Sequence, residues 1–233
     1  MLRHHFTAWT FAVVTGVAII VASCSESATS PISTEFTVTD SGYSSFDTIR
    51  LRNRLRGYAT SSISDSEVRA LKFVREEEKL VHDLYVDFSA RYNKLIFMNI
   101  AQSELTHANA VLQLLQRYQI ADPSQGIGPG VFADTMLQQL YTRLQTIGTS
   151  DLVSALLVSA EAEEMDLRDV SYWSARVDNQ DILMVFSNLA KGSRNHLRAF
   201  VRNLAQVGIR YSPRVLDQAT YDAIISTPVE RGG

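Results

Sequence analysis

The chain has 233 residues, 45% of them hydrophobic and 20% charged, which is enough to bury a core of ordinary size. Residues 1–23 have the character of a removable leader and contain one arginine; without them, 21 Lys and Arg face 25 Asp and Glu, a net charge of −4. This balance argues against a nucleic-acid-binding protein. Cys24 is the only cysteine, which excludes intramolecular disulfides, thiolate zinc sites and cysteine-bound iron–sulfur clusters.

The first 23 residues predict a secretory signal peptide. A weakly basic start, with Arg3 and two histidines, precedes residues 6–21, which are predominantly apolar and carry no charge. The apolar stretch is close to the lower length limit of a membrane-spanning helix, so an uncleaved anchor is the alternative.

Cys24 follows small residues in an arrangement that resembles a bacterial lipobox, with Val21 in place of the usual leucine. The resemblance implies that Cys24 is lipidated and anchors the protein to a membrane. The protein would then be exported across the inner membrane and held in the periplasm, at the outer membrane or on the cell surface, since Ser25 carries no inner-membrane retention signal. The alternative is a plain signal peptide cut nearby, which leaves a free thiol.

Residues 24–64 predict a Ser/Thr-rich tether between the anchor and the domain. They show little apolar periodicity, so we expect the segment to be mostly disordered. Its one basic cluster predicts a solvated charge run, with contact to anionic lipid head groups as the alternative. That cluster consists of Arg50, Arg52, Arg54 and Arg56.

A helical domain is predicted over residues 65–227, followed by a tail at 228–233. Ser64 supplies N-cap chemistry at its start, with Glu67 three residues on. A Gly/Pro-rich loop and a short helix at 133–146 divide the domain, and a small helix at 221–225 ends it. Apolar residues at steps of three and four predict four long amphipathic helices, at residues 65–92, 95–118, 150–176 and 180–207. The expected fold is all-α, a four-helix bundle.

Each of the four long helices has an apolar stripe that is interrupted by groups able to bind a metal. Residues three apart share a helix face, so Glu104 and His107 can reach the same ion. Burying several unpaired carboxylates would threaten a fold whose stability is only about 5–15 kcal/mol, and divalent cations would remove that penalty. We therefore interpret these residues as a metal cage, made of Glu78 (or Glu77), Glu104, His107, Glu163 and His196.

The pattern resembles the carboxylate-bridged di-iron proteins of the ferritin-like, rubrerythrin type, which use a Glu from each of two helices and Glu-x-x-His from each of the other two. The sequence is similar, more narrowly, to an uncharacterised ferritin-like domain family of bacteria and archaea over about residues 66–225. The similarity is carried by REEEKL at 75–80, NIAQSE at 99–104, EEMDLRD at 163–169 and GSRNHLRAF at 192–200. It implies a ferritin-like bundle with a metal site, and it brings no established activity.

Carried over residue by residue, the resemblance assigns the metal ligands Glu78, Glu104, His107, Glu163 and His196. It also implies that Tyr85 lies near the metal, where it would act as a catalytic electron donor.

Ser193 departs from the family pattern, which has a glutamate three residues before the histidine of the last long helix. One carboxylate of the full di-iron set is therefore absent. His82 is either an outer ligand or a surface residue. The candidates for additional or substitute ligands are Glu77, Glu164, Asp166 and Ser193.

Oxygen and nitrogen ligands without thiolates suit iron or manganese and would also accept zinc. We therefore expect two ions of iron or manganese, and oxygen- or peroxide-dependent oxidation of the metal or of a small reductant. The alternative is a non-enzymatic binding or structural lipoprotein with a degenerate or empty site, whose inward polar groups pair among themselves and with Asn195 and Arg198. A hydrolase is disfavoured, because the chain has no Gly-x-Ser-x-Gly elbow. A homodimer and other protein partners are left open.

Overall fold

The computed structural model describes residue 1, residues 35–39 and residues 43–231. The chain divides into two units, residues 1–33 and 34–233, and every helix and strand described belongs to the second. The predicted signal peptide and Cys24 lie outside the described residues. Within the described part, no helix combines the length and apolarity needed to cross a membrane. The predicted all-α class is confirmed, since the described elements are helices apart from one small two-stranded sheet.

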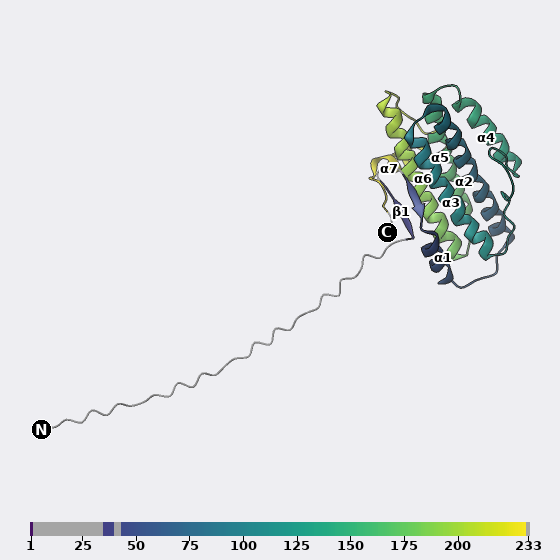
Figure 1. Cartoon of the computed structure of the whole chain (residues 1–233), viewed down its shortest axis with the longest axis vertical. Coiled ribbons are helices and arrows are strands. Elements are labelled where there is room, and N and C mark those ends of the chain that lie inside the picture. Colours follow the sequence, from purple (N-terminus) through teal and green to yellow (C-terminus); the bar gives the residue numbers. More distant parts are fainter. Residues whose placement is uncertain (2–34, 40–42, 232–233) are drawn as a thin grey trace. The chain divides into compact units, whose positions relative to one another are not determined.

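Four long helices form the bundle: α2 (Asp65–Tyr92), α3 (Leu95–Arg117), α5 (Leu152–Ser174) and α6 (Gln180–Gln206). The helices α2 and α3 pack along each other, and so do α5 and α6. Contacts between α2 and α5 and between α3 and α6 join the two pairs (Figure 1). Each helix therefore presents one face to a common interior.

Local sequence signals set the ends of these helices. Ser64 and Glu67 form a reciprocal capping box at the start of α2, as the sequence predicts. At the other end, Asn93 adopts a left-handed conformation with φ of 49°, and its N–H donates to the carbonyl of Ser89. The tight turn lets α3 begin two residues later, antiparallel to α2. The side chain of Asp151 caps α5 in the same way that Ser64 caps α2.

The two short helices expected from the sequence are present as α4 (Thr135–Gly148) and α7 (Gln218–Ser226). The helix α4 packs against α5 and α2, and α7 packs against α6. The apolar core falls into two clusters, one containing Leu84, Phe97 and Phe200 and the other containing Val74 and Phe186. The candidate metal ligands that interrupt the apolar stripes lie between these two clusters. They form a polar layer across the middle of the bundle.

The structure corrects the predicted tether at residues 24–64 within its described part, residues 35–39 and 43–64. Strands β1 (Phe36–Val38) and β2 (Ser44–Phe46) pair antiparallel, and α1 (Thr48–Arg56) follows them. Leu51 and Leu55 of α1 are buried, while the four arginines between and beside them are exposed. Strands of three residues are too short to show a distinct alternating pattern in the sequence. The helix α1 begins after Asp47, whose side chain caps its first N–H groups.

Candidate metal centre

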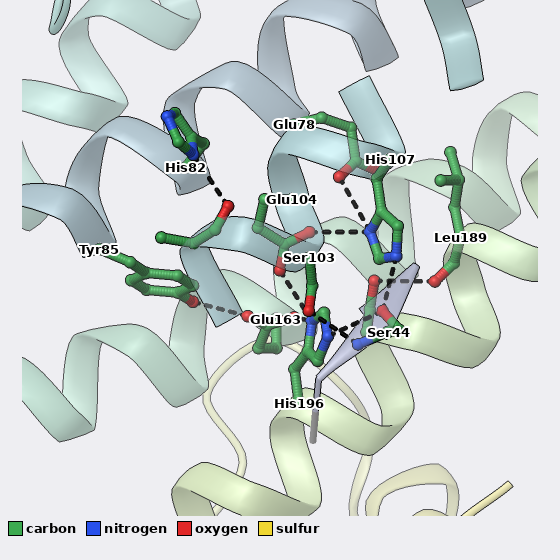
Figure 2. Close-up of polar contacts among 12 residues, drawn as sticks. Ser44, Glu78, His82, Tyr85, Ser103, Glu104, His107, Glu163, Leu189 and His196 are labelled. Carbon is green, nitrogen blue, oxygen red and sulfur yellow. Dashed lines mark hydrogen bonds and ion pairs between the residues drawn. The ribbon is translucent and has the colours of Figure 1, made fainter. Parts of the chain in front are cut away.

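Glu104 of α3 lies at the middle of the polar layer, between two histidines (Figure 2). Its Oε2 is 2.8 Å from Nδ1 of His107, one turn on along α3, and its Oε1 is 2.7 Å from Nδ1 of His196 on α6. One carboxylate thus faces two imidazole nitrogens, one with each oxygen. The three side chains are completely buried.

Glu78 of α2 and Glu163 of α5 complete two overlapping groups of ligands. Glu78 Oε2 is 3.4 Å from Nδ1 of His107, and Glu163 Oε2 is 3.3 Å from Nδ1 of His196. In each group, the candidate ligand atoms lie within 4.8 Å of one another: Glu78, Glu104 and His107 form the first, and Glu104, Glu163 and His196 form the second. Glu104 belongs to both groups, which is the arrangement expected of a carboxylate that bridges two ions.

The centre contains buried polar atoms without hydrogen-bond partners. In the described part of the chain these include Glu78 Oε2, Glu104 Oε1, Glu163 Oε2 and His196 Nδ1, whose polar contacts are the ion pairs between the carboxylates and the histidines given above. Both carboxylate oxygens of Asp166 and Oε1 of Glu77 are also buried and unpartnered. An unpartnered buried carboxylate is costly, and native proteins contain few of them, so each calls for a ligand or a proton.

The pKa values of the central groups follow from their burial and their contacts. Burial raises the pKa of Glu78 and that of Glu163 to about 7. Burial would also raise the pKa of Glu104, but the charges of His196 and His107 outweigh it and hold that pKa well below its usual range. Burial would lower the pKa of both histidines, yet Glu104 raises the pKa of His107 to about 9 and that of His196 to about 10. In the metal-free protein, protons therefore occupy the Nδ1 positions that face the carboxylates.

Tyr85 lies one contact away from the ligands. Its hydroxyl donates to Oε1 of Glu163 at 2.6 Å and also lies 3.2 Å from the carbonyl oxygen of Ser159. Its ring packs against Phe200 with the ring centroids 5.2 Å apart. Burial and the Glu163 carboxylate raise the pKa of Tyr85 well above its usual value, so the phenol keeps its proton.

Glu164, the predicted substitute for Glu163, has a different role in the structure. Its carboxylate accepts hydrogen bonds from the hydroxyl of Tyr211 and from the backbone N–H groups of Arg214, Val215 and Leu216. Adjacent helix positions point about 100° apart, so only one of the two neighbouring glutamates can face the bundle centre. Glu164 instead holds the segment that leads to α7.

The remaining candidates from the sequence occupy several places. Asp166 is buried one turn beyond Glu163, and Glu77 is buried beside Glu78, both with raised pKa values that burial causes. The hydroxyl of Ser193 donates to the carbonyl of Leu189 within α6. His82 forms a hydrogen bond through Nδ1 with the carbonyl of Ala101 and belongs to neither ligand group.

Comparison with known proteins identifies the domain that carries this centre. Residues 67–228 match the model of a family described as an uncharacterized protein domain, DUF2202. The chain belongs to this family. It is 44% identical over 170 residues to the uncharacterized protein MJ0754 of Methanocaldococcus jannaschii, a match that covers 73% of this chain and 92% of the relative. The crystal structure of that hypothetical protein aligns with a TM-score of 0.72 at 42% identity, covering 74% of this chain and 98% of the other.

The DUF2202 domain contains all five central ligand candidates, but one residue at the centre lies before its first matched position. Ser44, in β2, is completely buried, and its Oγ is 2.8 Å from Nε2 of His107 and 3.2 Å from Nε2 of His196. Ser44 is not among the site residues predicted from sequence, because the segment around it has the composition of a tether. The sequence signal for these strands is weak, because it consists only of short alternating patterns. The positions that face the bundle are Phe36, Val38, Ser44 and Phe46.

Gly192 makes room in the DUF2202 domain for the contact between α6 and the hairpin. A Cβ at this position would lie 2.5 Å from Cε1 of His107 and 3.2 Å from Oγ of Ser44. The first distance leaves no space for a methyl group against the buried ring, and the second is tighter than ordinary van der Waals contact. A glycine here is therefore a requirement of the site's packing.

Arg198 and Asn195, the predicted polar partners of the interior, lie elsewhere in the DUF2202 domain. Arg198 donates to Oδ1 of Asn195 and to the carbonyl of Ile224, and it also contacts Glu230. Within the described part of the chain, the ion pairs of Glu78, Glu104 and Glu163 come from His107 and His196. The structure thus corrects the expectation that Arg198 and Asn195 satisfy the central carboxylates.

Proposed function

We propose that the protein is a ferritin-like metalloprotein that binds two ions of iron or manganese at the layer between its two apolar clusters. The observation that carries this proposal is the pair of ligand groups that share Glu104. Each group offers one imidazole Nδ1 and two carboxylates, and the shared carboxylate has one oxygen directed at each histidine. Two ligand groups that share one carboxylate would hold a pair of ions.

The donor set fits the proposed ions. It consists of nitrogen and oxygen atoms without sulfur, which suits iron and manganese and would also accept zinc. The oxygens of Glu78, Glu104 and Glu163 that face the two histidines make no ordinary hydrogen bond, and a cation would satisfy them. Asp166 contributes two further unpartnered oxygens one turn from Glu163, so it is the candidate that replaces the carboxylate absent at Ser193.

The proposed activity is oxidation of the bound metal or of a small reductant by oxygen or peroxide. Bound iron or manganese would supply the one-electron redox chemistry. Glu104 orients both histidines, and the surrounding leucine, phenylalanine and tyrosine side chains exclude bulk water from the carboxylates. Tyr85 holds its phenolic proton against Oε1 of Glu163, the atom to which that proton can move when the phenol gives up an electron.

Stopped-flow spectroscopy tests the proposed redox activity. The protein, loaded with iron(II) without oxygen, is mixed with peroxide or with oxygen, and iron(III) absorbance is followed. We expect Tyr85→Phe to bind the same number of ions and to oxidise a small reductant more slowly than the unmodified protein. Tyr211→Phe is the matched control, because it removes a similar tyrosine–glutamate hydrogen bond at Glu164 and should leave the rate unchanged. Absence of any oxidation by the loaded protein would refute the redox role.

The second candidate is a non-enzymatic binding or structural protein with one ion or none. The observation that favours it is Ser193, whose hydroxyl is bonded within α6 at the position where the family pattern has a carboxylate. A single equivalent of metal without oxidation of any reductant would support this candidate.

The proposal places the protein at the cell envelope, anchored through a lipid on Cys24. It rests on the apolar run at residues 6–21 and on the small residues before the sole cysteine. Incorporation of labelled palmitate by cells that express the chain, and its loss in Cys24→Ser, would support the anchor. Equal labelling of both would refute it.

A further inference from the structure

We propose that Ser44 is a positioning residue of the metal centre, and that β1 and β2 close one side of the centre from outside the matched domain. The Ser44 hydroxyl holds the Nε2 atoms of His107 and His196, so that both Nδ1 atoms face the carboxylates. The part that concerns metal affinity rests on the proposed function. The part that concerns the two histidines does not.

The hydrogen-bonding capacity of one hydroxyl decides the direction of these contacts. Ser44 Oγ lies 2.8 Å from Nε2 of His107 and 3.2 Å from Nε2 of His196, and Figure 2 shows it between the two rings. A serine hydroxyl has one hydrogen to donate and two lone pairs to accept with. It can therefore donate to one imidazole only, and at least one histidine must donate its Nε2–H to Ser44. If both Nδ1 atoms held cations, both Nε2 atoms would carry hydrogen and Ser44 would accept from both.

Ser44 is itself fixed in place by the bundle. Its backbone N–H donates to Oγ of Ser103 at 2.8 Å, and the Ser103 hydroxyl donates to the carbonyl of Asn99. The register of the strands pairs Val38 with Ser44, and both face the bundle. The position of the hydroxyl is thus determined by α3, the helix that also carries Glu104 and His107.

Aromatic side chains from the same strands cover this side of His107. The ring centroids of Phe36 and Phe46 lie 6.1 Å and 6.0 Å from that of His107. The rings of His107 and His196 are stacked, with centroids 5.5 Å apart and planes 18° apart. The strands therefore act as a cap that orients one histidine directly and both through Ser44.

A chain of Ser44, His107 and Glu104 also has the connectivity of a hydrolytic triad, with the hydroxyl at Nε2 and the carboxylate at Nδ1. Three features favour positioning over nucleophilic attack. Ser44 is completely buried, it shares its hydroxyl between two imidazoles, and aromatic rings of its own hairpin cover the neighbouring His107.

Cobalt(II) titration of the full chain, after removal of bound metal by a chelator, tests the effect on affinity. We expect Ser44→Ala to weaken cobalt binding by at least about tenfold, the effect usual for a residue that orients a histidine ligand. Ser45→Ala is the matched control. Its hydroxyl contacts that of Thr37 on the other face of the hairpin, so its affinity should equal that of the unmodified protein. Equal affinity of Ser44→Ala and Ser45→Ala would overturn the proposal.

Nitrogen-15 NMR of the metal-free chain tests the histidine contacts independently of any metal. The unmodified protein should show an Nε2–H signal protected from solvent exchange for at least one of the two histidines. Every such signal should shift and lose protection in Ser44→Ala and persist in Ser45→Ala. Unchanged signals in Ser44→Ala, or labelling of Ser44 by a fluorophosphonate, would overturn the proposal. Altered signals in a protein that binds no cobalt would refute the proposed function while supporting the role of Ser44.

Discussion

Glu163 and Glu164 are neighbours in sequence, and both are completely buried, yet their hydrogen bonding differs. Glu164 accepts hydrogen bonds from a tyrosine and from three backbone N–H groups of the segment before α7. Glu163 accepts from Tyr85 through one oxygen, and its other oxygen makes no hydrogen bond and has only the 3.3 Å ion-pair contact with Nδ1 of His196. One carboxylate is satisfied by the protein, and the other faces the centre incompletely satisfied.

The difference teaches that burial does not distinguish a structural acid from a ligand, whereas hydrogen-bond satisfaction does. A buried carboxylate that receives several N–H groups stabilises the fold in its charged form. One left beside two other carboxylates is stabilised only by protons or by a cation. Mutation of a carboxylate at the centre should therefore change metal binding, whereas mutation of Glu164 should change stability.

The largest effect is expected where the two ligand groups meet. Glu104→Gln replaces the shared carboxylate by a neutral amide with a single acceptor oxygen, so neither ion keeps its bridging ligand. Elemental analysis should find the bound metal reduced from two equivalents to none. Circular dichroism should show the helices intact, because the amide fills the same volume. Retention of both ions would contradict the assignment of Glu104.

Substitution of the two neighbouring glutamates should separate metal binding from stability. Glu163→Gln should lose one equivalent of metal, and its metal-free form should be at least as stable as the unmodified protein. Glu164→Gln should retain two equivalents but lose about 1–3 kcal/mol of unfolding free energy, because an amide NH₂ cannot accept the backbone N–H bonds. Chemical denaturation and elemental analysis of both variants measure the two effects. Loss of metal from Glu164→Gln, with reduced stability but full metal content in Glu163→Gln, would contradict this assignment of the two glutamates.

Gly192→Ala tests the space left for His107. The new methyl group would lie 2.5 Å from the imidazole, so the ring or α6 must shift, at about 1–3 kcal/mol of stability and with weaker metal binding. Gly128→Ala is the control, because a Cβ there meets open space and the backbone is not left-handed. Equal melting temperatures for both variants would contradict the packing described around His107.

The stabilisation of the protein by a metal should grow as the pH rises, because the metal-free form loses stability over that range. Burial works against charged histidines, but Glu104 and its neighbours raise the folded-state pKa of His107 to about 9 and that of His196 to about 10. The stabilisation they give the metal-free protein is complete below the unfolded value of about 6.5 and is lost as the pH rises through 9 and 10.

A cation must displace the Nδ1 protons, so its stabilising effect grows over the same range. Thermal denaturation with chelator and with manganese, at pH 6.5 and pH 9, should show the difference in melting temperature widening at pH 9. A constant difference would mean that the histidines do not bind the metal.

The sequence carried enough information to predict the bundle and to place five ligand candidates on its inner face. The helical period of the stripes through Glu78, Glu104 and His107 determines which side chains point inward, and the structure brings them together. Sequence favoured Glu163 as the ligand but left Glu164 open as its substitute, because the role of Glu164 depends on a long-range contact with the segment of Arg214 to Leu216.

The cap was not predictable for a different physical reason. Each of its strands has three residues, and Ser44 is polar where the other inward positions are apolar. Its burial depends on two histidines that are distant in the sequence, so no local pattern reveals it.

The measurement that tests the central claim most directly is the metal content of the full chain after anaerobic loading with iron(II) and removal of excess ion. The shared position of Glu104 predicts two equivalents in the unmodified protein, and none in Glu104→Gln. Two equivalents that persist in Glu104→Gln, or none in the unmodified protein with its helices intact, would contradict a di-metal centre at this site.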